Sequence, residues 1–112
     1  MHPAVLEPGL DRHEWETEWQ ALEPLIEDSP REALPELDDL VARMLTARGY
    51  PVDGDEATLA GDEPEVLADF RTAREITRLA ESGADISPGD VAPAIEGYRN
   101  VYERLIEQRS AP

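Results

Sequence analysis

Residues 29–51 of the chain are SPREALPELDDLVARMLTARGYP, and this stretch decides the fold. Its apolar residues recur at spacings of three and four, which places them on one face of a helix: Leu37, Leu40, Val41, Met44 and Leu45. Ser29 as a cap and Pro30 at the first helical position mark the start of that helix. Gly49 and the proline after Tyr50 mark its end. We therefore expect a helix here whose apolar stripe forms the centre of the core.

Prolines interrupt two of the predicted helices. Pro35 disfavours helical geometry at Leu34, so the helix above is expected to be kinked there or to start afresh near Pro35. An earlier helix is predicted from Asp11, which forms a capping box with Glu14. Its apolar residues are Trp15, Trp19, Leu22 and Ile26. Pro24 is expected to kink this first helix or to end it near residues 19–23.

Two more helices are predicted in the second half of the chain. One runs from about residue 64 to residue 82 and stops at Gly83, and the other runs from the cap Ser87 to about Gln108. The predicted stripe of the third helix is Val66, Phe70, Ala73, Ile76 or Thr77, and Ala80, with Leu67 and Leu79 at its margins. The stripe of the fourth is Val91, Ile95, Tyr98, Tyr102 and Leu105, widened by Val101 and Ile106. The side chains of Arg71, Arg74 and Arg78 share one side of the third helix and are expected to face the acidic first or second helix.

These patterns predict an all-α protein, an antiparallel bundle of four helices with proline kinks. Residues 1–10 are expected to form a mobile tail, and residues 11–109 a single helical domain. Residues 53–63 form an acidic connector that lacks the ligand and glycine positions of an EF-hand loop, so a solvated loop is expected there.

The charge balance restricts the class of partner. Ten basic residues, all of them arginine, face 26 acidic ones, and the formal net charge is −16. A charge of this sign repels phosphate backbones, so direct binding of nucleic acid is not expected, whereas basic proteins and multivalent cations would be attracted. The chain has no cysteine and no apolar run longer than three residues. We therefore expect neither a disulfide nor a membrane span, and a cytoplasmic location.

Two groups of segments resemble a group of small uncharacterised bacterial proteins. The first group is 19–22, 26–33 and 38–41, and the second is 86–91, 94–95 and 98–106. In those proteins a Trp-Gln start leads into an Asp-x-Pro-Arg turn, matched here by Trp19-Gln20 and by Asp28-Ser29-Pro30-Arg31. A Tyr-Arg pair in their C-terminal helix is matched by Tyr98-Arg99. The resemblance covers about half of the chain, implies an all-helical fold and assigns no catalytic residue.

No residue is assigned to catalysis, to a cofactor or to a metal. His2 and His13 do not have the spacing of a metal site, and Ser29 and Ser87 are explained as helix caps. The leading hypothesis is a protein-interaction or structural module without catalytic activity. Its partner would be another protein or a second copy of the chain, and a homodimer would form through the first or the fourth helix.

Two other function classes remain open from the sequence. A magnesium-dependent helical phosphohydrolase would need inward-facing carboxylates, for which the candidates are Glu14, Glu18, Glu36 and Asp39. An inhibitor that mimics DNA would present carboxylates in place of phosphates, and residues 7–39 hold twelve acids against two arginines. Clustering of the four carboxylates around one cavity would favour the first class, and salt-sensitive binding of a nucleic-acid-binding protein would favour the second.

Overall fold

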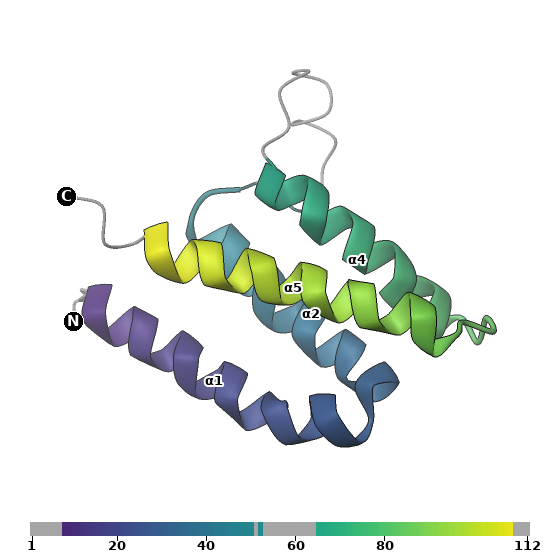
Figure 1. The fold of residues 1–112 in the computed structure, drawn as a ribbon. Coiled ribbons are helices and arrows are strands. Elements are labelled where there is room, and N and C mark those ends of the chain that lie inside the picture. The colour runs from purple at the N-terminus through teal and green to yellow at the C-terminus, as the bar shows by residue number, and fades with distance from the viewer. Residues whose placement is uncertain (1–7, 51, 53–64, 109–112) are drawn as a thin grey trace.

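The computed structural model describes residues 8–50, 52 and 65–108, which form four helices and no strand. The helices are α1 (Pro8–Asp28), α2 (Pro30–Ala47), α4 (Glu65–Glu81) and α5 (Pro88–Gln108). Successive helices run in opposite directions, and α2 and α5 lie between the outer helices α1 and α4 (Figure 1). The predicted all-α antiparallel bundle of four helices is therefore confirmed.

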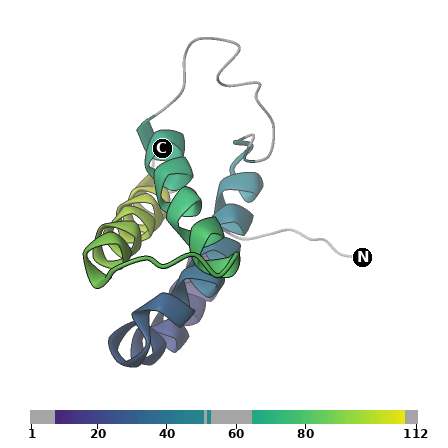
Figure 2. The ribbon, with the colours of Figure 1, turned by 90° about the vertical axis from the view of Figure 1, so that its right-hand side faces the viewer.

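Helix α2 is the centre of the molecule because it packs against all three other helices (Figures 1 and 2). Its buried residues are at most 1% exposed: Ala33, Leu34, Leu37, Leu40, Val41, Met44 and Leu45. All five predicted stripe residues are in this set, and Ala33 and Leu34 extend the stripe toward the start of the helix. Full burial of one such leucine contributes about 1.5–3 kcal/mol relative to its exposed state, so this stripe dominates the core.

The prolines do not divide the helices. Pro24, Pro35 and Pro93 lie inside α1, α2 and α5, each of which is assigned as one continuous helix. The first helix therefore does not end near residues 19–23, and the second does not start afresh near Pro35, so these two predicted alternatives are wrong. A proline removes one helical hydrogen bond, but the burial of Ala33 and Leu34 just before Pro35 holds the first turn of α2 in place.

Helix α1 begins earlier than the sequence analysis predicts. Its first residue is Pro8 rather than Asp11, and a proline is well suited to the first helical position because the amide it lacks would have no partner there. Of the predicted tail, residues 8–10 belong to α1, and residues 1–7 lie outside the described part of the chain. The predicted solvated connector at residues 53–63 also lies outside it.

One residue, Ser29, joins α1 to α2. Its amide donates to the carbonyl of Leu25 (2.7 Å) and closes α1, while its own carbonyl accepts from the amide of Ala33 (3.0 Å) and opens α2. Ser29 is the N-cap residue, as predicted, but its side chain makes no capping hydrogen bond. The hydrogen bonds of Ser29 at this joint are therefore made by its backbone.

The ends of α2 and α4 share one geometry. Gly49 and Gly83 have φ of 90° and 87°, a region that glycine reaches without strain. After each glycine the next amide donates back five residues, from Tyr50 to Leu45 and from Ala84 to Leu79, at 3.0 Å in both cases. Both predicted helix stops are therefore confirmed as Schellman motifs.

Helices α4 and α5 pack closely along their length. The buried residues of α4 are Val66, Leu67, Phe70, Ala73 and Thr77, so Leu67 belongs to the core rather than to its margin, and Thr77 rather than Ile76 faces inward. The buried residues of α5 are Val91, Ala94, Ile95, Tyr98, Val101, Leu105 and Ile106. A Cβ atom at Gly97 would lie 3.4 Å from the Cβ of Ala73, so glycine at this position allows the two helices to approach.

Candidate functional site

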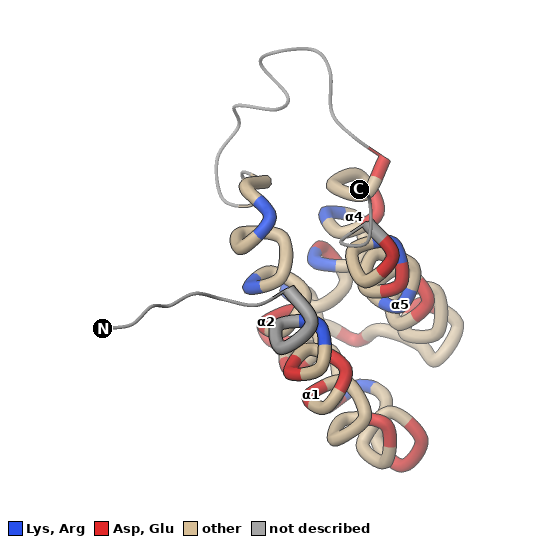
Figure 3. Tube along the Cα trace, turned by 90° about the vertical axis from the view of Figure 1, so that its left-hand side faces the viewer, with Lys and Arg blue, Asp and Glu red and all other residues tan. Residues whose placement is uncertain are grey.

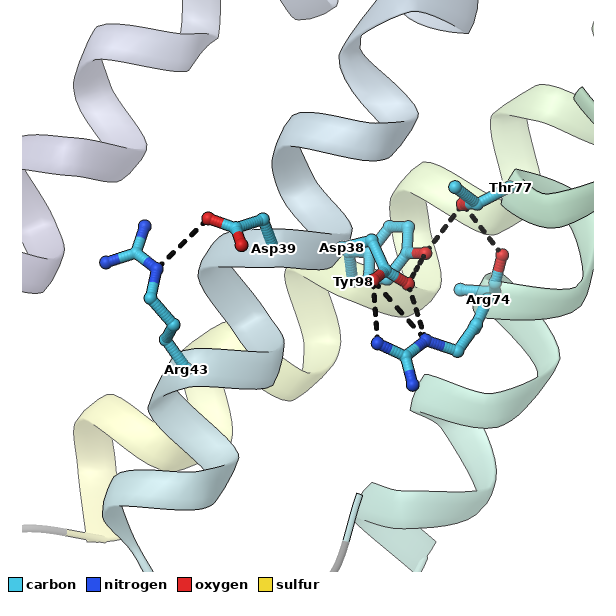
Figure 4. Close-up of polar contacts among 7 residues, drawn as sticks. Asp38, Asp39, Arg43, Arg74, Thr77 and Tyr98 are labelled. Atoms are coloured by element: carbon cyan, nitrogen blue, oxygen red, sulfur yellow. Dashed lines mark hydrogen bonds and ion pairs between the residues drawn. The ribbon is translucent and has the colours of Figure 1, made fainter. Parts of the chain in front are cut away.

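Three helices bring polar side chains together beside the core. Asp38 comes from α2, Arg74 and Thr77 come from α4, and Tyr98 comes from α5 (Figure 4). The guanidinium of Arg74 donates to Asp38 through Nε (3.1 Å to Oδ2) and Nη2 (3.0 Å to Oδ1). The Tyr98 hydroxyl donates to Asp38 Oδ2 at 2.7 Å. We call these four residues the polar cluster.

The protons of the polar cluster follow from its geometry. A carboxylate only accepts, so the Tyr98 hydroxyl gives its proton to Asp38. Thr77 Oγ1 lies 2.6 Å from the Tyr98 hydroxyl and 3.1 Å from the carbonyl of Ala73, and its single proton goes to one of these two oxygens. Burial raises the pKa of Tyr98 well above its ordinary value, and the nearby charge of Asp38 adds to that rise.

The contacts of the polar cluster connect three helices. The side chains of Asp38 and Arg74 are only 14% and 17% exposed, and their charges compensate each other. Each of the hydrogen bonds above that involves Asp38 joins α2 to α4 or α5. Bidentate charge-assisted bonds of this kind fix orientation as well as adding stability, so the cluster sets how α4 and α5 dock on α2.

A second set of contacts ties α1 to α5. Trp19 stacks on Tyr102 with ring centroids 4.4 Å apart and an angle of 15° between the rings. The indole N–H of Trp19 donates to Glu23 at 2.7 Å, and Arg99 pairs with Glu23 at 3.5 Å while lying over the Trp19 ring. Trp19 is 4% exposed, so this tryptophan is a core residue rather than an exposed anchor for a partner.

The four carboxylates that were candidates for magnesium ligands do not converge on one point. Glu18 and Asp39 both bind the guanidinium of Arg43, at 2.7 Å and 3.1 Å, so a cationic side chain already lies between them. Glu14 and Glu36 are exposed. Within the described residues no group of three or more histidine, cysteine, aspartate or glutamate side chains is placed to hold a metal ion.

A surface groove lies where the joint between α1 and α2 meets the start of α5. Its volume is about 620 Å³. The apolar and small residues that line it are Ile26, Ser29, Pro30, Ile86, Pro88, Val91, Ala92 and Ile95. Its charged lining residues are Arg31, Glu32, Glu96 and Arg99. We call this feature the joint groove, and its volume is in the range of sites that bind ligands or side chains of a partner.

Both arginines of the joint groove already have partners within the fold. Arg31 donates through Nη2 to the carbonyls of Ala80 (3.3 Å) and Ala84 (3.0 Å), which ties the start of α2 to the end of α4. Arg99 pairs with Glu23 at 3.5 Å and lies 3.9 Å from Glu96. Both arginines thus make contacts within the fold around the groove.

The sequence analysis predicted part of this arrangement. Arg71, Arg74 and Arg78 were expected to face the first or the second helix, and for Arg74 the ion pair with Asp38 of α2 confirms this. The sequence analysis did not find Asp38 itself, although Asp38 lies four residues after Leu34 and three before Val41, which places it on the buried stripe. It also missed the joint groove, because no local pattern shows that residues 26–32 and 86–99 meet.

Comparisons of the chain with protein-family models, with curated proteins and with solved structures find no match. The resemblance to small bacterial helical proteins stays a prediction. No helix in the described part of the chain has both the length and the apolar character that crossing a membrane requires. A function therefore has to be argued from the charges and surfaces of the fold.

Proposed function

We propose that this protein is a small acidic interaction module that binds basic partner proteins and carries out no catalysis. The observation that carries the proposal is how the charges are distributed over α1 and the start of α2. Five carboxylates there are exposed and make no ion pair with another described residue: Glu14, Glu27, Asp28, Glu32 and Glu36. Acidic positions follow one another along α1 in Figure 3.

The arginines do not neutralise this acidic face, because many of them act inside the fold. Arg12, Arg43, Arg74, Arg99 and Arg104 each pair with a carboxylate, and Arg31 binds backbone carbonyls. The whole chain has a net charge of −16, and among the described residues these five carboxylates are exposed and have no arginine partner. Such a field speeds the encounter with basic surfaces and disfavours acidic ones.

Other partners and classes have less support. Among the described residues, Leu79 is the one large hydrophobic side chain that is exposed (46%), so a broad apolar face for a homodimer through α1 or α5 is not found there. A phosphohydrolase has less support because Arg43 lies between Glu18 and Asp39. The proposed location is the cytoplasm, supported by a sequence without cysteine.

A charge-reversal experiment tests the proposal. The variant Glu27→Lys/Glu32→Lys/Glu36→Lys reverses three of the five charges of the acidic face, and Glu75→Lys/Glu81→Lys/Glu103→Lys makes the same change of net charge at exposed positions of α4 and α5. Both variants and the natural chain are immobilised on beads and incubated with a lysate of the native host. The captured proteins are then quantified by mass spectrometry. We expect proteins of net positive charge to be retained by the natural chain and by the control, and to be lost from the first variant.

The salt dependence of capture completes this test. Screening shortens the range of exposed charges to about 10 Å at 0.1 M salt and about 3 Å at 1 M, so the captured proteins should elute as salt is raised. Equal capture by the two variants, or capture that resists salt, would contradict the proposal. Release of the captured proteins by duplex DNA would instead identify the chain as a DNA-mimicking inhibitor.

A further inference from the structure

We propose that the joint groove is the docking site for a segment of another protein that presents a large apolar side chain between lysine or arginine residues. This inference rests on the function proposed above and names the site and the chemistry of the partner. It follows from the apolar walls of the groove, from the acidic groups around it and from the internal use of its arginines.

The walls of the joint groove are apolar because two helices start there with proline. Pro30 and Pro88 occupy the first positions of α2 and α5, where they present a ring and no amide donor. Ile26 from α1 and Ile86 from the α4–α5 loop are partly buried beside them. The groove therefore offers a surface that favours an apolar side chain over water.

The end of the α5 stripe that reaches the groove gives it an apolar floor. Val91 and Ile95 line the groove and are 6% and 7% exposed, so this floor is already largely buried. The hydrophobic driving force for docking is therefore the burial of the partner's own apolar side chain against this floor and the proline walls.

The charges around the groove select a basic partner. Glu32 and Glu96 line it, and the turns that carry its lining residues also carry exposed Glu27, Asp28 and Asp85. Arg31 keeps its positive charge, because its partners are neutral carbonyls, and Arg99 pairs with Glu23 and lies 3.9 Å from Glu96. Exposed Glu27, Asp28, Glu32 and Asp85 still outnumber Arg31, so the surroundings of the groove are acidic. Lysine or arginine residues on either side of the inserted side chain would therefore meet carboxylates.

The same charges disfavour two other occupants. A second copy of the chain would bring its own net charge of −16 against the acidic groups around the groove, and like charges oppose association. A nucleic acid would bring its phosphates against the same carboxylates. The basic apolar segment is the occupant for which both the walls and the charges are complementary.

Three synthetic helical peptides and two variants of the full chain test the inference. The first peptide carries a leucine stripe on a lysine-rich helix, the second has alanine in place of every leucine, and the third has glutamate in place of every lysine. Ala92→Arg puts a long side chain on the groove, and Ala68→Arg adds the same charge at an exposed alanine near the start of α4. Affinities are measured by calorimetry, and circular dichroism checks that both variants are folded.

We expect the leucine–lysine peptide to bind the natural chain at least about tenfold more tightly than either other peptide. Ala92→Arg should weaken that binding about tenfold, and Ala68→Arg should change it by less than about twofold. If the alanine–lysine peptide binds equally well, or if the two variants behave alike, the groove is not the site and the more general proposal of an acidic interaction module stands. If neither lysine peptide binds, the interaction module is contradicted as well.

Discussion

At the scale of single residues, the side chain of Tyr98 unites the core with the polar cluster. Its ring is 0% exposed and packs edge-on against Phe70, with centroids 6.1 Å apart. Its hydroxyl lies between Asp38 and Thr77, so a polar atom at the end of a fully buried side chain keeps its hydrogen bonds. A buried tyrosine placed in this way specifies one docking of α5 on α2, because a shifted helix would leave the hydroxyl without a partner.

Removal of this hydroxyl should be costly. Tyr98→Phe keeps the ring but takes away the donor to Asp38 and a partner of Thr77, so we expect a loss of about 1–3 kcal/mol in the free energy of unfolding. Urea denaturation followed by tryptophan fluorescence measures this change. Tyr102→Phe is the matched control, because Tyr102 is half-buried and stacks on Trp19 through its ring. Equal losses in both variants would show that the hydroxyl of Tyr98 has no special role.

The same variant should also alter the response to alkaline pH. Burial raises the pKa of Tyr98 above its ordinary value of 10.0, so the folded chain keeps this proton where the unfolded chain releases it. The unfolded state then binds fewer protons, and stability falls by up to about 1.4 kcal/mol for each pH unit above pH 10. Tyr98→Phe has no hydroxyl to ionise, so its free energy of unfolding does not fall with pH for this reason. The difference in free energy of unfolding between the natural chain and Tyr98→Phe should therefore shrink between about pH 9 and about pH 11. A constant difference would contradict the assignment.

The sequence predicts which residues are apolar and inward-facing, but not how polar ones are paired. The stripe of α2 follows from spacing alone, because a helix with one apolar face has only one way to bury it. Asp38 occupies that same face, and its partners lie 36 and 60 residues further along the chain. Such pairings depend on which helices are neighbours, and a pattern within one helix does not contain that information.

At the scale of the helices, their ends were easier to predict than their continuity. Pro30 and Pro88 start α2 and α5, and Gly49 and Gly83 follow the ends of α2 and α4, as their residue types indicate. Pro35 was expected to kink α2 or to mark a fresh start of it, because local propensity opposes a proline inside a helix. The packing of Ala33 and Leu34 overrides that local cost. Pro8 was not predicted as the start of α1, because Asp11 and Glu14 have the spacing of a capping box and indicated a start three residues later.

Two glycines in different backbone conformations predict opposite effects for the same substitution to alanine. Gly83→Ala places a Cβ atom at φ 87°, where no neighbour lies within 4 Å, so the cost is backbone strain alone. We expect a loss of about 1–2 kcal/mol in the free energy of unfolding. Gly89→Ala lies inside the first turn of α5, where alanine is the better helix former, and should raise stability by up to about 1 kcal/mol.

Thermal and urea unfolding of the two glycine variants provide the measurement. Loss of stability in Gly83→Ala with a gain in Gly89→Ala would show that the left-handed backbone conformation matters. A change of the same sign and size in both would indicate that the end of α4 relaxes around an alanine, and the Schellman geometry would then contribute little.

At the scale of the whole molecule, most arginines form ion pairs within the fold, whereas several acids do not. Five arginines pair with carboxylates of the same helix or of a neighbouring helix: Arg12, Arg43, Arg74, Arg99 and Arg104. Five acids of α1 and α2 are exposed and make no ion pair with another described residue, and Figure 3 shows the acidic positions along the trace of these helices. Net charge and the concentration of acid in residues 7–39 were evident from the sequence, but the joint groove exists only once α1, α2 and α5 are assembled. This is why the sequence indicated the sign of the charge that the proposed partner should carry and not the proposed place of binding.

Mapping the bound leucine–lysine peptide on the full chain tests the central claim most directly. Backbone amide shifts of isotope-labelled protein, recorded by NMR during the titration, report which residues the peptide contacts. The account predicts saturable changes concentrated at residues 26–32 and 86–99, the two segments that form the joint groove. Changes spread along the outer face of α1, with none at Val91 or Ile95, would contradict it.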